Sequence, residues 1–297
     1  MSRTFTILKH TFREAISQPI YGLLVAVGAV VLVVYGTLPF FTLGEDTVMF
    51  KAVALDVILL VVLLASLFAA SRSIFEEIED RTMLTLMSKP VSRAEVLVGK
   101  YLGLLASSGL AVLALGTILG IAVYLRVPGD EGLPPVPLDD DLAEQLWSIR
   151  YMHLAGLVPQ LLLSWMQIGV LIAISVAIST RFSLVVNLPA TLLLYVAGNL
   201  TQFVEYAAAG EGSIARAGAY AVNTILPFLS VFDAKDLTVY SPIAVTDSLS
   251  ADPNAVTQVG IWLVVAAGAV YFLGYATFVL GVGVVSLQRR DLGGNDG

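Results

Sequence analysis

The sequence predicts an all-α membrane protein, with six transmembrane helices that form one domain over residues 1–297. Hydrophobic residues make up 57% of the chain, and Asp, Glu, Lys and Arg only 13%, which is far more apolar than a soluble domain. A hydrocarbon core about 30 Å thick takes roughly 20 helical residues to cross. Since lipid offers no partner to an unpaired backbone group, each crossing is expected to be a helix. Six apolar stretches are long enough: residues 20–41, 52–70, 101–125, 152–180, 184–203 and 257–286.

The distribution of positive charge predicts that both termini are cytoplasmic. Eleven of the 16 Lys and Arg residues fall in segments 1–19, 71–100, 181–183 and 287–297, and five fall in the longer segments on the other side. Loops rich in Lys and Arg stay in the cytoplasm, so we expect a multi-pass protein of the cytoplasmic (inner) cell membrane. The net charge of −7 arises from the acidic outer segments. No basic patch predicts nucleic-acid binding.

The first residues of the chain, TFTILKHTFREAISQP, predict an amphipathic helix that lies in the inner interface of the membrane. Phe5, Leu8, Phe12 and Ile16 recur at helical spacing. Basic residues lie elsewhere around the same helix, as in helices that bind anionic headgroups. A simple anchor helix without a protein partner is the alternative.

The longest cytoplasmic segment, residues 71–100, combines charged side chains with an apolar stripe. The stripe indicates a short amphipathic helix, and Pro90 ends the pattern because proline disfavours a helical residue before it. Ser92 and Glu95 have the spacing of a capping box, which would start a new helix into the third span. A solvated connection is the alternative, but joining two spans takes only a few residues. The stripe consists of Phe75, Ile78, Met83, Leu86 and Met87.

The run EEIEDRTMLTLMSKPVSRAEVLVGKYLG in this loop resembles the cytoplasmic loop of ABC type-2 exporter permeases, the integral-membrane subunits of ATP-driven export systems. SLQRRDL near the C-terminus and LPFLSVFDAKDL before the sixth span are similar to segments of the same family. The resemblance implies that residues 76–88 form a coupling helix that sits in a groove of a separate ATP-binding subunit. It also implies a dimer with a second permease copy, identical or not. The residues expected to contact the ATPase subunit are Glu76, Glu77, Glu79, Arg81, Leu84, Leu86, Pro90 and Arg93.

The chain itself is expected to be a transport subunit and not an enzyme, with no cofactor of its own. A phosphate-binding loop needs a glycine five residues before its Gly-Lys pair, and Ser or Thr directly after the pair. Gly99-Lys100 has Ala94 and Tyr101 at these positions. We therefore interpret the pair as a membrane boundary, with the lysine reaching toward the headgroups. ATP and Mg²⁺ are expected to bind to the partner ATPase.

Two other functions remain open from the sequence. Glu76-Glu77-x-x-x-Arg81 fits the signature of CAAX-type intramembrane proteases, in which a glutamate activates water. Those enzymes also need histidines at set spacing, and His153 has neither Phe four residues before it nor Asn or Asp four residues after it. The other alternative is a secondary transporter, whose paired broken helices in two repeats have no convincing counterpart in this sequence.

Polar residues inside the spans predict a candidate substrate pathway. Asp56 lies in the second span, and Asn187 and Asn199 lie in the fifth. An ionisable residue within a membrane is a functional candidate by default. In the family that the loop resembles, the second and fifth spans line the path at the dimer axis. The alternatives are an interfacial position for Asp56, near the outer end of its span, and hydrogen bonds between helices for the asparagines.

The two longest outer segments, residues 126–150 and 204–256, are expected to cap the membrane domain. The first is proline-rich and acidic, and a helix capped near Asp139 is expected to follow. Metal binding by Asp139–Asp141 is less expected than a solvated helix N-terminus, where negative charge is favourable. Whether the second segment re-enters the membrane is left open by its sequence.

The predicted sides of the membrane can be tested with single cysteines, because the chain contains none of its own. We predict that cysteines at Asp140 and Asp247 react with an impermeant thiol reagent in intact cells, whereas cysteines at Ser88 and Asn295 do not. Labelling at Ser88 would contradict the orientation.

Overall fold

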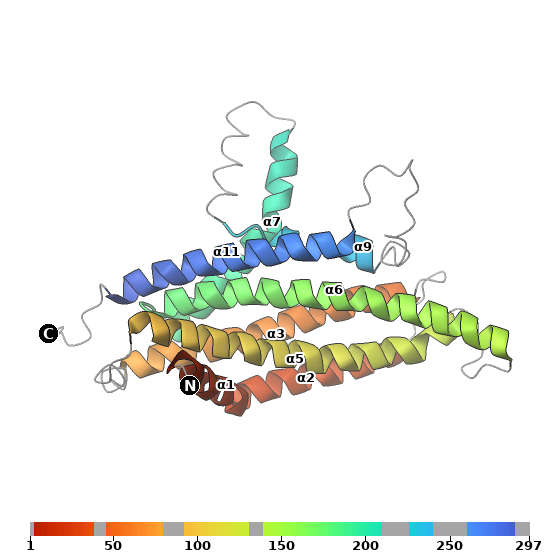
Figure 1. The fold of residues 1–297 in the computed structure, drawn as a ribbon, viewed down its shortest axis with the longest axis horizontal. Coiled ribbons are helices and arrows are strands. Elements are labelled where there is room, and N and C mark those ends of the chain that lie inside the picture. Colours follow the sequence, from red (N-terminus) through yellow and green to blue (C-terminus); the bar gives the residue numbers. More distant parts are fainter. Residues whose placement is uncertain are drawn as a thin grey trace.

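The computed structural model describes residues 3–38, 46–79, 92–130, 139–209, 226–239 and 260–288, and helices account for almost all of them (Figure 1). The predicted all-α class is confirmed for these ranges. In chain order the elements are α1 (Arg3–Ser17), α2 (Pro19–Thr37), α3 (Asp46–Glu79), α5 (Arg93–Asp130), α6 (Asp140–Ser179), α7 (Leu184–Ala209), η1 (Leu229–Phe232), α9 (Lys235–Thr238) and α11 (Ile261–Gln288).

Six of these helices are long and apolar enough to cross a membrane, and each overlaps one of the six predicted spans. Three of them, α3, α5 and α6, have 34, 38 and 40 residues. At about 1.5 Å per residue they are about 51–60 Å long, so they extend beyond a hydrocarbon core about 30 Å thick. The apolar lengths are Pro19–Thr37, Thr47–Ser73, Arg93–Gly129, Asp140–Ser179, Leu184–Thr201 and Ile261–Gln288.

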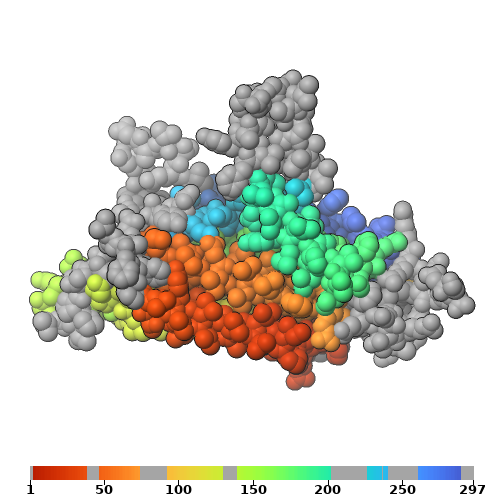
Figure 2. All heavy atoms as spheres, turned by 180° about the vertical axis from the view of Figure 1, so that it is seen from behind, coloured from red at the N-terminus to blue at the C-terminus, as the bar shows by residue number. Residues whose placement is uncertain are grey.

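The centre of the bundle is formed by α3 and α6, and the other spans surround them. The apolar stretch of α6 is 72% buried and that of α3 is 61% buried, against 17% for α2 and 28% for α11. Seen from behind, α2, α3 and α7 lie along one face of the molecule (Figure 2). The peripheral helices therefore leave wide apolar surfaces that only lipid or another membrane protein could cover.

The second span continues without a break through Glu79. The sequence predicted a separate amphipathic helix from about Glu76, but the stretch from Ser71 to Glu79 contains neither glycine nor proline to interrupt α3. Glu76, Glu77 and Glu79 therefore lie on an extension of α3. The remainder of the predicted coupling helix, residues 80–88, lies outside the described residues.

Both predicted helix starts are confirmed. Ser92 N–H donates to Glu95 Oε2 at 2.8 Å, and Glu95 N–H donates to Ser92 Oγ at 3.2 Å, which is the reciprocal pair of a capping box. Asp139 Oδ1 accepts a hydrogen bond from Leu142 N–H at 2.9 Å and so caps α6. The third span and the long fourth helix thus begin where their local sequences place them.

The N-terminal helix α1 packs against the start of α5 through two glycines. A Cβ added at Gly103 would lie 2.8 Å from the carbonyl oxygen of Leu8, and one at Gly99 would lie 2.9 Å from Ile7 Cβ. Only glycine allows this approach, because the backbone atoms Leu8 O and Phe12 N of α1, with Thr11 Cβ, occupy the space that a Cβ at Gly103 would need.

The predicted apolar face of α1 is divided between this contact and the exterior. Leu8 and Phe12 are half-buried, whereas Phe5 and Ile16 are exposed. The helix therefore uses one side to hold α5 and keeps apolar side chains for the membrane, as expected of an interfacial helix.

A methyl group at Gly103 should loosen α1 without affecting the spans. We predict that Gly103→Ala costs about 1–3 kcal/mol, as typical overpacking does, and speeds tryptic cleavage at Lys9 and Arg13. The control is Gly22→Ala in α2, where no atom lies within 4 Å of an added Cβ. Equal cleavage rates in the two variants would contradict the described packing of α1.

Candidate functional site

The candidate site is built around residues 226–239, a segment with two short helical turns, η1 and α9. The segment contacts α6, α7 and α11, and its residues Leu229, Phe232 and Val239 are fully buried. Backbone groups that are buried outside a regular helix need other hydrogen-bond partners. The structure supplies these partners from the side chains of neighbouring helices.

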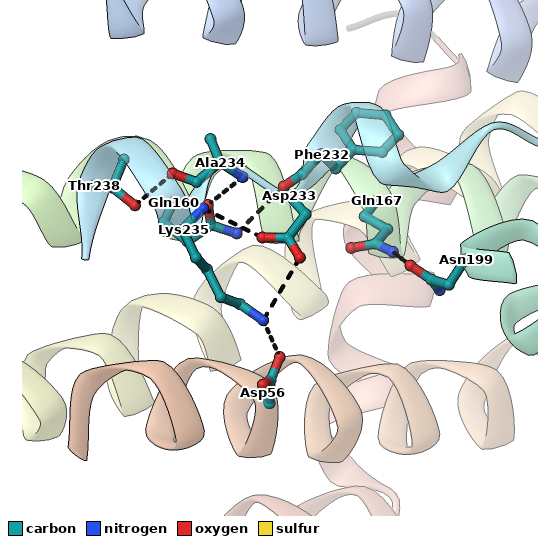
Figure 3. A network of polar contacts seen from close by, with 9 residues as sticks. All are labelled: Asp56, Gln160, Gln167, Asn199, Phe232, Asp233, Ala234, Lys235 and Thr238. Carbon is teal, nitrogen blue, oxygen red and sulfur yellow. Dashed lines mark hydrogen bonds and ion pairs between the residues drawn. The ribbon is translucent and has the colours of Figure 1, made fainter. Parts of the chain in front are cut away.

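Gln160 of α6 holds the middle of the segment (Figure 3). Its Nε2 donates to the carbonyl oxygen of Phe232 at 3.2 Å, and its Oε1 accepts from the N–H of Ala234 at 3.0 Å. The side chain is buried, and an amide offers both a donor and an acceptor. One residue of α6 therefore fixes the backbone on both sides of Asp233.

Two further side chains hold the ends of the segment. The N–H of Phe228 donates to the hydroxyl of Tyr271 in α11 at 2.8 Å. At the other end, Lys51 Nζ of α3 lies 3.5 Å from the carbonyl oxygen of Val239. The segment is thereby tied to α3, α6 and α11.

Glycines on two helices allow the segment to approach closely. A Cβ at Gly156 of α6 would lie 2.3 Å from the carbonyl oxygen of Thr238, and one at Gly198 of α7 would lie 2.6 Å from that of Pro227. Real Cβ contacts of this length do not occur. Both positions therefore require glycine, because any larger side chain would displace the segment.

The predicted pathway residue Asp56 forms an ion pair with this segment (Figure 3). Lys235 Nζ lies 2.5 Å from Asp56 Oδ1 and 3.8 Å from Asp233 Oδ2. The side chains of Asp56 and Asp233 are 60% and 56% exposed, and that of Lys235 is 19% exposed. Because Lys235 is mostly buried and Asp56 belongs to a membrane span, water does not screen this pair as it screens one at a soluble surface, and the pair links α3 to the segment.

The other two predicted pathway residues have different surroundings. Asn199 is half-buried, accepts from Gln167 Nε2 at 3.4 Å and lies beside the segment (Figure 3). Asn187 is fully buried and donates to Ser71 Oγ at 2.7 Å and to Ser175 Oγ at 2.9 Å. Asn187 thus joins α3, α6 and α7, whereas Asn199 pairs with Gln167 of α6.

Among the predicted coupling residues, the structure describes the side chain of Arg93. Its guanidinium donates to the carbonyl oxygens of Leu287 at 2.6 Å and Gln288 at 3.1 Å, where a cation is favoured at the end of a helix. Arg93 therefore connects the start of α5 to the end of α11. The side chains of Glu76, Glu77 and Glu79, and the whole of Arg81, Leu84, Leu86 and Pro90, lie outside the described part of the chain.

The expectation that Lys100 reaches toward the headgroups is wrong. Lys100 is only 3% exposed, and its Nζ donates to the carbonyl oxygen and the hydroxyl of Ser73. The lysine points into the bundle because Ser73 offers it acceptors on α3. It joins α5 to the last turns of α3, just before the predicted coupling residues.

The geometry also argues against the protease hypothesis. His153 Nδ1 lies 3.0 Å from Lys51 Nζ, whereas Glu76 is 25 residues further along the same helix as Lys51. At about 1.5 Å per residue that distance is roughly 37 Å. Glu76 and His153 cannot share one active site.

Lys235 and Gln160 were not identified from the sequence as site residues. Lys235 stands between acids in FDAKDL, and a search for a cation to balance the intramembrane Asp56 could have found it, because charges in membranes pair. Gln160 offered no comparable signal. Its role depends on a backbone segment more than 70 residues away.

The sequence matches a family model described as ABC-2 family transporter protein over residues 5–292. The chain belongs to this ABC-2 transporter family. A search of curated proteins found no match.

Membership of this family supports a role as an ABC permease, and the six apolar helices make the chain a multi-pass membrane protein. The ABC-2 transporter chain is a membrane subunit for transport, which agrees with the resemblance first seen in its cytoplasmic loop. Among the described residues, no group of three or more His, Asp or Glu could hold a metal ion. The polar cluster around Asp56 and residues 226–239 is its candidate site.

Replacing Gln160 should release residues 226–239. We predict that Gln160→Leu, which keeps the side-chain size but leaves two buried backbone groups without partners, costs about 1–3 kcal/mol for each group. Hydrogen exchange of peptides that contain Phe232 and Ala234 should become faster. The matched control is Gln145→Leu, at an exposed position of the same helix. Unchanged exchange in Gln160→Leu would show that Gln160 does not hold residues 226–239.

Proposed function

We propose that this ABC-2 transporter chain is the permease subunit of an ABC exporter. It forms the substrate pathway as a dimer, with an identical or related second copy. Separate ATP-binding subunits, which bind ATP and Mg²⁺, drive the cycle. The observation that carries the proposal is the family match over nearly the whole chain, residues 5–292.

The contacts at one end of the bundle support coupling through the segment between α3 and α5. Lys100 ties α5 to α3, Arg93 ties α5 to the end of α11, and Gly99 and Gly103 seat α1 on α5. A force applied between Glu79 and Ser92 would therefore reach four helices at once. Because α3 and α5 are continuous from this end into the bundle, they can carry the displacement into the membrane.

The polar cluster supports a pathway beside α3 and α7. The side chains of Asp56 and Asp233 are exposed and pair with Lys235, and a second polar pair, Gln167 and Asn199, joins α6 and α7 beside residues 226–239 (Figure 3). A rearrangement of α3 would change the distance from Asp56 to Lys235, since the two side chains belong to different segments. Opening and closing of this ion pair is the step that we assign to the change of access.

Two sequence-based alternatives lose support. The CAAX-protease hypothesis requires Glu76 and a histidine of a later span at one site, and the geometry separates Glu76 from His153. The secondary-transporter hypothesis would need internal repeats, whereas the family match assigns the chain to a class that is powered by ATP.

The coupling proposal is tested in the loop between α3 and α5. We predict that Leu84→Ala combined with Arg81→Glu leaves membrane insertion and abundance near wild type. Co-purification of the ATPase subunit and transport-linked ATP hydrolysis should both fall. The leucine loses an apolar contact, and the reversed charge adds repulsion to an already acidic stretch. Loss of a buried leucine costs about 2–5 kcal/mol in a packed core, and we expect less at a partly wet interface.

The matched comparison is Asp56→Asn, which lies far from the loop. This variant should leave binding of the ATPase subunit intact, whatever its effect on transport. Normal assembly and coupling in the double loop variant would show that the loop is only a connector, and the assignment as an ATP-driven permease would lose its mechanistic support.

A further inference from the structure

A groove runs along the exposed side of α11 near its C-terminal end. It has a volume of about 670 Å³ and is lined by Arg181, Thr277, Phe278, Gly281, Val282, Val285 and Ser286. Its α11 residues are spaced as one helical face. The groove lies away from the polar cluster around Asp56, and the proposed transport cycle makes no use of it.

Glycine produces the hollow in this face. No atom lies within 4 Å of a Cβ added at Gly281. On the walls of the hollow, Phe278 is 68% exposed and Val282 is 53% exposed. The polar hydroxyl of Thr277 donates to the carbonyl oxygen of Leu273 in its own helix at 2.7 Å. The floor and walls of the groove are therefore apolar and are suited to a hydrocarbon chain.

A fixed guanidinium stands at the end of the groove. Arg181 Nε donates to Ser286 Oγ at 2.9 Å, and a terminal nitrogen of Arg181 donates to the Ser286 carbonyl oxygen at 3.4 Å. A guanidinium has five N–H donors, so the others remain available. Arg181 is exposed, and within the described ranges it forms no ion pair with an acidic side chain.

We infer that this groove holds one anionic phospholipid, with an acyl chain along Phe278–Val285 and its phosphate at Arg181. Guanidinium and phosphate form strong charge-assisted hydrogen bonds. The Ser286 contacts hold the guanidinium in position beforehand, which lowers the cost of binding.

The position of Arg181 also favours a lipid over another transmembrane helix. A helix laid over the groove would cover the guanidinium with apolar surface, and covering a charge without a partner is unfavourable. A phospholipid brings its own negative charge to the boundary. Arg181 lies at the end of α6 where the sequence predicts the cytoplasmic side, and anionic lipids are enriched in that leaflet.

The inference is tested by measuring lipid retention by the full-length protein. The purified chain is incubated in mixed micelles with phosphatidylglycerol or phosphatidylcholine of identical acyl chains, and bound lipid is counted by native mass spectrometry. We expect one retained phosphatidylglycerol that phosphatidylcholine does not displace. Glycerol phosphate, which has the headgroup chemistry but no acyl chain, should also fail to displace it.

Two variants remove the two halves of the site. Arg181→Gln should weaken phosphatidylglycerol binding about fivefold, the effect of one cation near an anionic membrane surface. Gly281→Leu places a side chain in the hollow, where no atom lies within 4 Å of an added Cβ, and should also reduce retention. The controls are Arg13→Gln, which removes an exposed arginine from α1, and Gly274→Leu, a second α11 glycine with open space around an added Cβ.

The controls decide between this site and general attraction to the membrane. Loss of retention in Arg181→Gln and Gly281→Leu, with both controls at wild-type level, supports the site. Equal retention in Arg181→Gln and Arg13→Gln would overturn it. A changed oligomeric mass with unchanged lipid would also overturn it, and would assign the groove to a second protein copy. The Gly281→Leu result keeps the test valid if Arg181→Gln disturbs the contacts of Ser286.

Discussion

Every buried backbone N–H and C=O of this chain must find a partner within the protein, because a bilayer offers none. The spans satisfy this constraint as helices. Residues 226–239 depart from regular helix in the described bundle, and side chains satisfy them instead: Gln160 at Phe232 and Ala234, and Tyr271 at Phe228. The candidate site is located where this departure occurs.

The same constraint explains why the site combines a fixed backbone with an ion pair that can open. Gln160 and the glycines at positions 156 and 198 fix the backbone of the segment, since they form buried contacts that leave no space for adjustment. The ion pair of Asp56 and Lys235 joins the side chains of two different segments at the surface of the bundle. A conformational change can break the ion pair while the segment stays attached to α6, which suits a pathway that alternates between two states.

The opposite end of the bundle is organised by cations that bind helix carbonyls. Arg93 binds the end of α11, and Lys100 binds Ser73 of α3. Arg181 binds Ser286 and leaves part of its guanidinium exposed at the groove on α11. The positive charges from which we predict the orientation thus also join the helices that we expect an ATPase subunit to move.

Local sequence patterns were enough to predict the helices and where two of them start. Apolar runs of the required length defined six helices, and the Ser92–Glu95 spacing and Asp139 marked two helix starts that the structure confirms. The resemblance in the cytoplasmic loop pointed to the family that the match over residues 5–292 shows. These features depend on residues that are close in sequence, so they can be predicted without knowing the tertiary structure.

Which polar residues act together depends instead on how distant segments pack against each other. Asn187 and Asn199 belong to the same helix, yet one closes a buried contact of three helices and the other pairs with Gln167 of α6 beside residues 226–239. Lys100 has the sequence of a boundary lysine but points inward, because an acceptor on α3 lies within its reach. The partners Asp56 and Lys235 are 179 residues apart. Such pairs form through packing between distant segments, and helical periodicity carries no information about them.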